Sequence, residues 1–211
     1  MTDVVVIPRA TISRLPVYFR VLMELSHMEV SLVSSDELAA RSGVSSSQLR
    51  KDLSYFGEFG IRGAGYDVGF LLQKIREILG IHREWRLVIA GAGKLGTALA
   101  RYSGFAQHGL EVAALFDIDP GKQGKMTGKI PVLPMEDLTG FVQKHDIQIG
   151  VITVPAQAAQ GVADLMVRAG LKGIWNFAPV RIEVPDDVIV QYEDLVVGLL
   201  TLSHHLSRRM R

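Results

Sequence analysis

The chain has 211 residues, of which 48% are hydrophobic and 21% are charged, and its formal net charge at pH 7 is +1. This composition excludes an intrinsically disordered protein, and the length fits two modest folded domains. The chain contains no cysteine, which excludes disulfides, thiolate metal ligands and cysteine nucleophiles.

The charge and histidine patterns narrow the set of partners. We expect no metal site, because the six histidines are scattered and no pair has a carboxylate partner at metal-ligand spacing. We expect no membrane partner and a cytoplasmic location, because the sequence shows no signal peptide and no apolar run of about 18 residues. Residues 1–80 contain nine basic and nine acidic side chains, so their bulk charge gives no evidence of DNA binding.

The first predicted element is an amphipathic helix near the N-terminus. Its apolar residues recur with helical spacing at Tyr18, Val21, Leu22 and Leu25. Pro16 is expected near the start of this helix, where a missing N–H costs little.

Two N-capping signatures follow in close succession. Ser34 stands three residues before Glu37, and Ser45 stands three residues before Gln48, so each pair predicts a capping box at the start of a helix. The second of these helices is expected over residues 46–56. A short helix, a tight turn and a second helix together predict a helix-turn-helix motif.

The second capped helix is the candidate recognition helix. Its buried stripe is expected to be Leu49, Leu53 and Phe56. Arg50 and Lys51 on the outer face suit base edges and phosphates in a DNA major groove, where arginine can bond O6 and N7 of guanine together. The alternative is a solvated helix face without a ligand. The residues predicted for the outer face are Ser46, Ser47, Arg50, Lys51, Ser54 and Tyr55.

The segment after this helix is rich in glycine. Glycines alternate with aromatic and aliphatic residues over 57–66, which predicts a small β-hairpin. A hairpin directly after a recognition helix is the wing of a winged helix. Arg62 at its tip is placed to enter a minor groove, where negative potential is highest over A·T-rich DNA. A further helix is expected over 68–79, followed by a linker over 81–85.

From Arg86 onward, short apolar strands alternate with helices. This rhythm predicts an α/β fold with a doubly wound parallel sheet. The strands are expected over residues 87–90, 112–116, 147–154, 172–177 and 188–192, and the helices up to residue 105, over 156–169 and over 195–209.

A glycine motif connects the first of these strands to its helix. Gly91, Gly93 and Gly96 follow the strand without a gap, and Asp117 ends the next strand 21 residues beyond Gly96. This context predicts a dinucleotide site, in which the glycines allow a tight turn, close approach to a pyrophosphate and close helix–strand packing. The turn is completed by Ala92, Lys94 and Leu95. The alternative is a glycine turn without a ligand.

Asp117 is expected to determine which dinucleotide binds. Asp117 would accept hydrogen bonds from the adenosine ribose hydroxyls and repel a 2′-phosphate, which favours NAD(H) over NADP(H). Two other functions fit this half of the chain. A small NAD-dependent dehydrogenase would need a substrate domain and a proton relay, and only 94 residues follow Asp117. A CoA-binding or nucleotide-binding module shares the same half of the fold.

With both halves in place, the chain resembles the Rex family of redox-sensing transcriptional repressors over almost its whole length. The motifs that carry the resemblance are QLRKDLSYFG from Gln48, GIRGAGY from Gly60, GAGKLG from Gly91, FDIDP from Phe116, VP at Val154 and NFAP from Asn176. One departure is Arg101-Tyr102-Ser103, where the family has other residues on both sides of the tyrosine.

The resemblance implies a repressor without enzymatic activity, whose cofactors are NADH and NAD⁺. It implies a homodimer that holds an inverted-repeat operator in double-stranded DNA while NADH is low and releases it when NADH binds. The expected domains are a winged helix-turn-helix domain over 1–80, a Rossmann NAD(H)-binding domain over 81–194, and a C-terminal dimer helix over 195–211 that is exchanged between subunits.

The resemblance also implies roles for individual residues. Arg50, Lys51 and Arg62 match the family's DNA-contacting residues. The cofactor site would gain Val154, Pro155, Asn176 and Ala178, and an apolar pocket that also includes Phe177 would prefer the neutral reduced ring to the charged oxidised one. A switch that rearranges near the nicotinamide would consist of Arg20, Tyr102 and Asp194.

Overall fold

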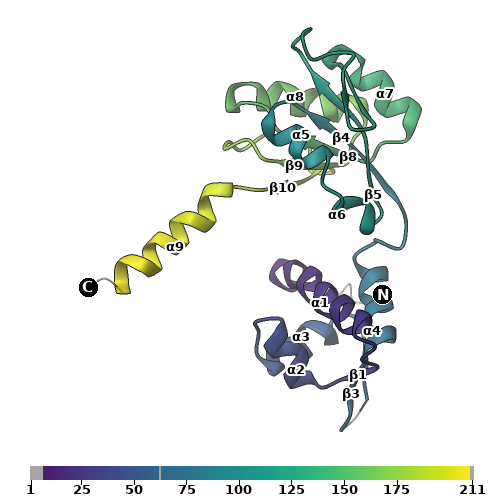
Figure 1. The fold of residues 1–211 in the computed structure, drawn as a ribbon, viewed down its shortest axis with the longest axis vertical. Helices are drawn as coiled ribbons and strands as arrows, with labels where there is room; N and C mark the ends of the chain where they lie inside the picture. Colours follow the sequence, from purple (N-terminus) through teal and green to yellow (C-terminus); the bar gives the residue numbers. More distant parts are fainter. Residues whose placement is uncertain (1–6, 62, 210–211) are drawn as a thin grey trace. The chain divides into compact units, whose positions relative to one another are not determined.

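The computed structural model describes residues 7–61 and 63–209, and it divides into two compact units between Arg83 and Glu84 (Figure 1). The first unit contains the predicted helix-turn-helix and hairpin. Its elements are α1 (Arg9–His27), β1 (Leu32–Val33), α2 (Ser35–Arg41), α3 (Ser46–Ser54), β2 (Gly60–Ile61), β3 (Gly65–Asp67) and α4 (Val68–Ile78).

The predicted hairpin is confirmed, and it belongs to a larger sheet. β2 and β3 pair in antiparallel fashion, and β1 adds a third strand on the other side of β3, which the sequence pattern does not predict. Gly65 permits this close pairing. Its φ is +108°, and a Cβ at this position would lie 2.2 Å from the carbonyl oxygen of Val33. The wing is therefore tied to the strand that precedes the helix-turn-helix.

The helices of the first unit enclose one apolar core. Leu15 and Leu22 of α1, Leu38 of α2 and Leu49 of α3 are fully buried in it. The buried stripe of α1 begins earlier than the predicted one, so Pro16 lies inside the helix and the expectation that it starts the helix is wrong. Burial of the preceding turns against the core compensates for the hydrogen bond that this proline cannot donate.

Both predicted N-caps are confirmed. The hydroxyl of Ser34 accepts from the backbone N–H of Glu37 at 3.1 Å, and that of Ser45 accepts from the N–H of Gln48 at 3.2 Å. The reciprocal half of each capping box is wrong, because the Glu37 and Gln48 side chains bond residues four positions later on their own helices.

The candidate recognition helix α3 ends at Ser54, two residues before the predicted end. Tyr55 is its C-cap and Phe56 lies beyond it, and both are only partly buried. Phe56 of the predicted buried stripe is therefore only partly buried, and it packs against the edge of the core.

The second unit is built on a seven-stranded sheet. The strand order is β10-β9-β8-β4-β5-β7-β6, and all neighbours are parallel except β6, which is antiparallel to β7. Its elements are β4 (Trp85–Ala90), α5 (Lys94–Ala100), α6 (Gly104–Gln107), β5 (Leu110–Asp117), β6 (Met126–Thr127), β7 (Ile130–Pro134), a 3-10 turn (Met135–Asp137), α7 (Leu138–His145), β8 (Ile149–Ile152), α8 (Ala156–Ala169), β9 (Gly173–Asn176), β10 (Ile189–Tyr192) and α9 (Leu195–Arg209).

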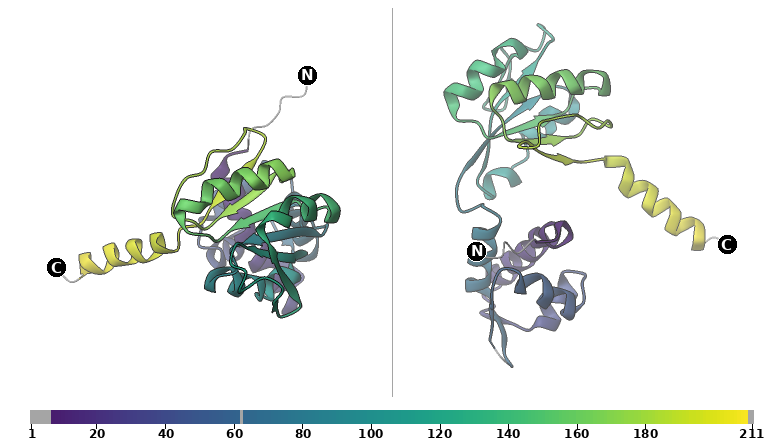
Figure 2. Two further views of the ribbon diagram at one scale, coloured as in Figure 1. Left: turned by 90° about the horizontal axis from the view of Figure 1, so that it is seen from above. Right: turned by 180° about the vertical axis from the view of Figure 1, so that it is seen from behind.

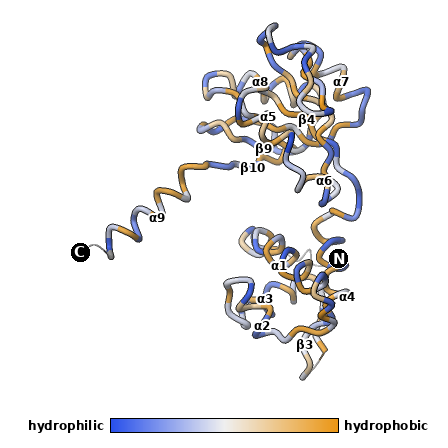
Figure 3. The backbone as a smooth tube through the Cα atoms, viewed as in Figure 1, coloured by the Kyte–Doolittle hydropathy of each residue, from blue (hydrophilic) through white to orange (hydrophobic). Residues whose placement is uncertain are grey.

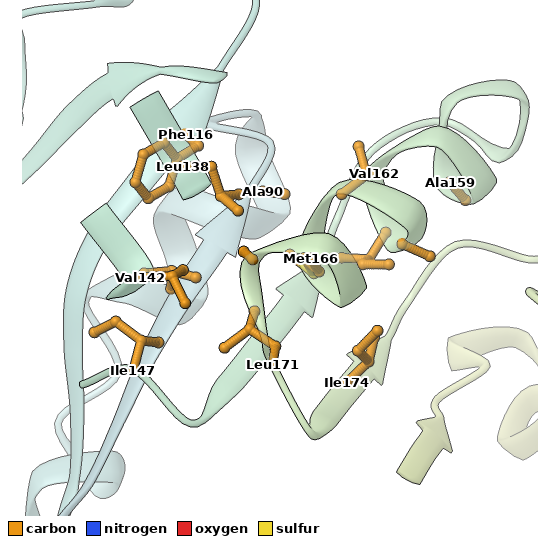
Figure 4. Close-up of a cluster of buried hydrophobic side chains, with 14 of the residues drawn as sticks. Ala90, Phe116, Leu138, Val142, Ile147, Ala159, Val162, Met166, Leu171 and Ile174 are labelled. Atoms are coloured by element: carbon orange, nitrogen blue, oxygen red, sulfur yellow. The ribbon is translucent and has the colours of Figure 1, made fainter. Parts of the chain in front are cut away.

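Alternate residues of the strands bury against different helices. Val88 and Ala90 of β4 pack with α7 and α8, and α8 lies across the strands (Figure 2). Figure 4 shows side chains of α7 and α8, such as Leu138 and Met166, converging on Phe116 and its neighbours from the sheet. Leu87 and Ile89 belong to the other apolar cluster, which includes residues of α5. The doubly wound parallel sheet is thus confirmed.

The chain passes from β4 to β5 on one side and later returns to place β8 on the other side of β4. The strand order therefore reverses at β4. In open α/β sheets, ligands bind in the crevice outside the carboxyl ends of the strands at such a point.

Three local expectations for this unit need correction. β4 begins at Trp85, which the prediction assigned to a linker, because this residue already pairs with Leu110 of β5. The helix predicted up to residue 105 is two helices, α5 and α6, with Tyr102 in the break between them. Residues 118–146, for which the sequence pattern predicts no element, contain β6, β7 and α7.

The C-terminal helix α9 has the predicted bounds and an unusual surface. Every residue from Leu195 to Arg208 is exposed, although Figure 3 shows apolar residues recurring along the helix. Leu199 and Leu200 are 67% and 62% exposed. In the described part of the chain, no helix has the length and apolarity needed to cross a membrane.

Candidate functional site

A cleft of about 640 Å³ lies at the carboxyl ends of the central strands of the second unit. It contains most of the predicted dinucleotide-binding residues. The residues that line it are Gly91, Gly93, Leu95, Asp117, Ile118, Asp119, Lys122, Met135, Thr153, Val154, Pro155, Ala158, Val162 and Phe177.

The three motif glycines have different surroundings. Gly91 has a φ of +102°, which favours glycine. A Cβ on Gly96 would lie 1.9 Å from the carbonyl oxygen of Gly91, so this position requires glycine for close packing of α5. A Cβ on Gly93 would meet nothing within 4 Å, and Gly93 lines the cleft. Only Gly93 thus leaves open space where a ligand can approach the backbone.

Asp117 is buried at the end of β5 and already holds three hydrogen bonds. Its Oδ2 accepts from the backbone N–H of Ala92 at 2.8 Å and from Lys122 Nζ at 2.9 Å, and its Oδ1 accepts from the N–H of Asp119 at 2.9 Å. Burial alone would raise the pKa of Asp117, but these hydrogen bonds outweigh it and lower the pKa. The acid is therefore ionised at neutral pH, and one of its roughly four acceptor positions stays free, on Oδ1.

Lys122 is a cleft residue that the fingerprint pattern does not identify. Its ammonium lies 2.9 Å from the carboxylate of Asp117 and 3.9 Å from that of Asp119. The sequence signal was its position five residues after the acid, within the same loop. A cation beside Asp117 changes the charge that a ligand meets in this cleft.

The rest of the cleft wall is apolar. Val154, Pro155 and Phe177 line it as predicted, and Met135 and Val162 extend the apolar surface. Thr153 fixes the wall to the glycine turn, because its hydroxyl donates to the carbonyl oxygens of Ala90 and Gly91. An aqueous cation would lose hydration on entering such a surface.

Other residues predicted for the cofactor site lie elsewhere. Lys94 is exposed at the start of α5 and does not line the cleft. Asn176 and Ala178 line a smaller hollow of about 270 Å³, which also contains Asp194. The side chain of Asn176 is fully buried and bonds the backbone of its own loop, donating to the carbonyl of Val180 at 2.8 Å and accepting from the N–H of Ala178 at 2.9 Å. It shapes the loop after β9.

A row of aromatic rings leads away from the cleft. Phe177 contacts Trp175 with ring centroids 4.4 Å apart, Trp175 lies 6.2 Å from Phe105, and Phe105 lies 5.3 Å from Tyr102. Tyr102 itself is 61% exposed. The row places the predicted switch tyrosine at the end of a packed path from the apolar wall.

The outer face of α3 is the candidate DNA-binding surface. Arg50, Lys51 and Ser47 are exposed, as predicted. Neither base forms an ion pair with any residue in the described ranges 7–61 and 63–209. Ser46 is partly buried and donates to the carboxylate of Asp36, and Tyr55 is partly buried at the C-cap, so both are less available than predicted.

The recognition helix and the wing adjoin each other. Arg50 lines a hollow of about 420 Å³ together with Ile61 and Gly63 of the hairpin and Ser34 at the start of α2. The backbone of the wing turns where Ala64 N–H donates to the carbonyl of Ile61 at 3.0 Å. Arg62, the predicted minor-groove residue, lies outside the described residues.

Arg20 is exposed on α1 in the first unit, whereas Tyr102 and Asp194 belong to the second unit. The carboxylate of Asp194 accepts from the backbone N–H of Val196 and so starts α9. The switch trio remains a prediction. Among the described residues, no group of three or more histidine, aspartate or glutamate side chains is placed to hold a metal ion.

Two family models match parts of the chain. A model for the N-terminus of putative DNA-binding proteins matches residues 6–54, and a model for the CoA binding domain matches residues 82–180.

Curated proteins match over nearly the full length. The redox-sensing transcriptional repressor Rex of Streptomyces coelicolor is 49% identical over 96% of this chain and 79% of its own. The Rex protein of Syntrophomonas wolfei is 48% identical over 97% of this chain and 98% of its own.

Solved structures match both units at once. A crystal structure of RSP in complex with β-NAD⁺ and operator DNA has a TM-score of 0.92 and 40% sequence identity, and it covers 97% of this chain and 94% of that one. A structure of RSP, described as a Rex-family repressor, in complex with β-NADH has a TM-score of 0.89 and 38% identity over 99% of this chain and 97% of that one.

Proposed function

The chain belongs to the Rex family of redox-sensing transcriptional repressors, and from this premise we propose how its own residues perform sensing. It is a DNA-binding regulator that responds to the NADH/NAD⁺ ratio, and it is not an enzyme. We propose that it is a homodimer that binds an inverted-repeat operator while NADH is low and leaves it when NADH rises. We also propose a cytoplasmic location, with which the DNA partner is consistent.

One observation carries this proposal. The same chain presents a basic helix face, without ion pairs to other described residues, beside a wing, and it has a fingerprint cleft with a buried acid; both units match a solved repressor at once. Arg50 and Lys51 would meet the major groove from the exposed face of α3. We propose that the residues at the ends of that face contact the phosphate backbone of the DNA; they are Ser46, Ser47 and Tyr55.

The cleft has the features that a dinucleotide needs. Gly93 leaves open space for the pyrophosphate, and Asp117 is ionised and keeps a free acceptor position for a ribose hydroxyl. The match to the CoA-binding model covers only this half of the fold. CoA carries a phosphate on its adenosine ribose, and the carboxylate of Asp117 disfavours it, so we propose NAD(H) as the ligand.

The apolar wall is proposed to recognise the reduced ring. NAD⁺ carries a positive charge on the nicotinamide, and its burial against Val154, Pro155 and Phe177 would cost hydration that the neutral reduced ring does not lose. Sensing also requires that the two dimer conformations bind NADH with different affinity, because a ligand that binds both equally shifts nothing. Operator DNA must then weaken NADH binding by the same factor by which NADH weakens operator binding.

α9 is proposed as the dimer element. Its apolar side chains are exposed in the single chain and would gain from burial against a second copy. Arg20, Tyr102 and Asp194 are proposed to rearrange with the dimer, and the aromatic row from Phe177 to Tyr102 offers a packed connection to the cleft.

The test is an operator gel shift with NADH and NAD⁺ titrated separately. The DNA is the duplex that the protein itself selects from a randomised pool. We expect NADH to release it at concentrations where NAD⁺ does not. Equal release by the two nucleotides at matched saturation would contradict the proposed sensing, and selection of no sequence would contradict the repressor function.

A further inference from the structure

The recognition helix α3 carries a buried acidic residue, Asp52, next to its exposed basic residues Arg50 and Lys51. Asp52 directly follows Arg50 and Lys51, yet its side chain is fully buried. Three residues of α1 donate to its carboxylate. Arg14 Nε and Nη2 lie 2.6 and 2.7 Å from it, the Tyr18 hydroxyl lies 2.6 Å away, and the Thr11 hydroxyl lies 3.0 Å away.

A fifth hydrogen bond comes from α3 itself. The Gln48 amide donates to Asp52 Oδ1 at 2.9 Å, so the amide that was expected in a capping box instead orients the acid. We call these five residues the Asp52 hub: Thr11, Arg14, Tyr18, Gln48 and Asp52. The α1 members are spaced by three and four residues and therefore share one face of that helix.

The hydrogen bonds of the hub restrain the rotation of α3 about its own axis. Successive helix residues differ by about 100°, so Arg50 points nearly opposite to Asp52 and Lys51 lies between them. The leucines of α3 pack against the core, but apolar contacts are non-directional. The carboxylate of Asp52 is held by both Nε and Nη2 of Arg14, and this bidentate geometry favours one orientation of the acid. The orientation of the acid in turn sets the direction of Arg50 and Lys51.

Burial of this acid is costly, and stability alone does not explain it. Burial by itself would raise the pKa of Asp52, but the hydrogen bonds from Arg14, Tyr18, Gln48 and Thr11 outweigh it and hold the pKa far below its ordinary value. Apolar residues of similar volume often stabilise a core as well as a buried ion pair does. What the ion pair adds is a defined geometry.

We propose that the Asp52 hub is a positioning device for DNA recognition, in which Arg14 and Tyr18 of α1 orient the recognition helix through Asp52 so that Arg50 and Lys51 address the bases of the operator. This inference rests on the proposed function. In this proposal Arg14, Tyr18 and Asp52 act on DNA recognition through the exposed face of α3 and not through contacts of their own with DNA.

The test compares specific with non-specific DNA binding in full-length variants. Arg14→Lys keeps the charge but loses the bidentate geometry, and Tyr18→Phe removes one hydrogen bond from the carboxylate. Arg9→Lys is the matched control, because Arg9 is an exposed arginine of the same helix. Affinity is measured for the duplex that the wild-type protein selects from a randomised pool and for an unrelated duplex of equal length.

We expect Arg14→Lys to lower the ratio of specific to non-specific affinity by about tenfold. When Arg50 and Lys51 point in the wrong direction, they lose their contacts to the DNA bases but keep contacts to the phosphates. Tyr18→Phe should lower the ratio in the same direction by less, and Arg9→Lys should leave it unchanged. NADH affinity and the thermal midpoint, measured on the same samples, report whether each variant is folded.

A purely stabilising hub predicts another result. Partial unfolding would reduce both DNA affinities in the same proportion, so an unchanged ratio in folded Arg14→Lys protein overturns the proposal. If the wild-type protein selects no sequence from the pool, the proposed function fails instead, and the two failures are distinct.

Discussion

Gly93→Ala is the most direct test of the dinucleotide cleft, because the structure separates its effect on binding from its effect on folding. Gly93 has a φ of −83°, which alanine also adopts, and its added Cβ would meet nothing within 4 Å. We expect a change in unfolding free energy below about 1 kcal/mol, the size of an N-cap substitution.

The same methyl group would occupy the space that a pyrophosphate needs. Overpacking of this kind costs about 1–3 kcal/mol, or about 5- to 150-fold in Kd for NADH. Gly96→Ala should instead act mainly on folding stability. Its Cβ would lie 1.9 Å from the carbonyl oxygen of Gly91, so the backbone must move and the thermal midpoint should fall.

The assay is a fluorescence titration with NADH beside thermal unfolding of each variant. Gly161→Ala is the matched control, because Gly161 lies exposed on α8 with open space around its Cβ. It should stabilise the helix by up to about 1 kcal/mol and leave NADH binding unchanged. If Gly93→Ala binds NADH as tightly as the wild type while remaining folded, the assignment of the pyrophosphate to this turn is wrong.

Three further predictions follow from the described contacts. Asp117→Asn should weaken NADH binding by about tenfold through loss of a charged acceptor. Lys122→Met should weaken NADPH binding more than NADH binding, because the cation offsets the repulsion between the carboxylate and a 2′-phosphate. Competition titrations of both nucleotides measure this preference, and an unchanged preference in Lys122→Met would contradict the prediction. The pKa of Asp52 is lowered on folding, so its contribution to stability is present above the ordinary value of 3.8 and is lost as the pH falls below it. Asp52→Asn should cost about 3 kcal/mol at neutral pH and flatten this acid limb in denaturant titrations, and a limb of unchanged steepness would refute the assignment. Leu199→Glu on α9 should dissociate the proposed homodimer in sedimentation experiments, with Thr201→Glu, on the side of the same exposed helix that faces away from Leu199, as the control; dimers that persist in Leu199→Glu would place the interface elsewhere.

Features that depend on neighbouring residues were predictable from the sequence. The bounds of α8 and α9, the two serine N-caps and the glycine turn before α5 all follow from local spacing, because helix periodicity and capping involve residues within one or two turns. The fingerprint glycines and the acid after the next strand could be located for the same reason, and their roles in ligand binding stay predictions. The resemblance to a family then supplied what spacing alone does not, namely the partners of the two halves.

Features that depend on distant residues required the tertiary structure. The partners of Asp52 on α1 lie 34 to 41 residues away in sequence, and no pattern in the recognition helix announces that one of its charges is buried. Pro16 stays within α1 because core packing outweighs a lost hydrogen bond, a balance that propensity does not contain. The ion pair between Lys122 and Asp117 likewise depends on the path of the loop after β5, because a spacing of five residues is a signal for proximity but does not by itself predict the contact. Sequence periodicity therefore determined most of the helices and strands, but not β1, β6, β7 and α7. The directions of charged side chains such as Asp52 were decided by the groups that could satisfy them, and those lie on chain segments brought together only by folding.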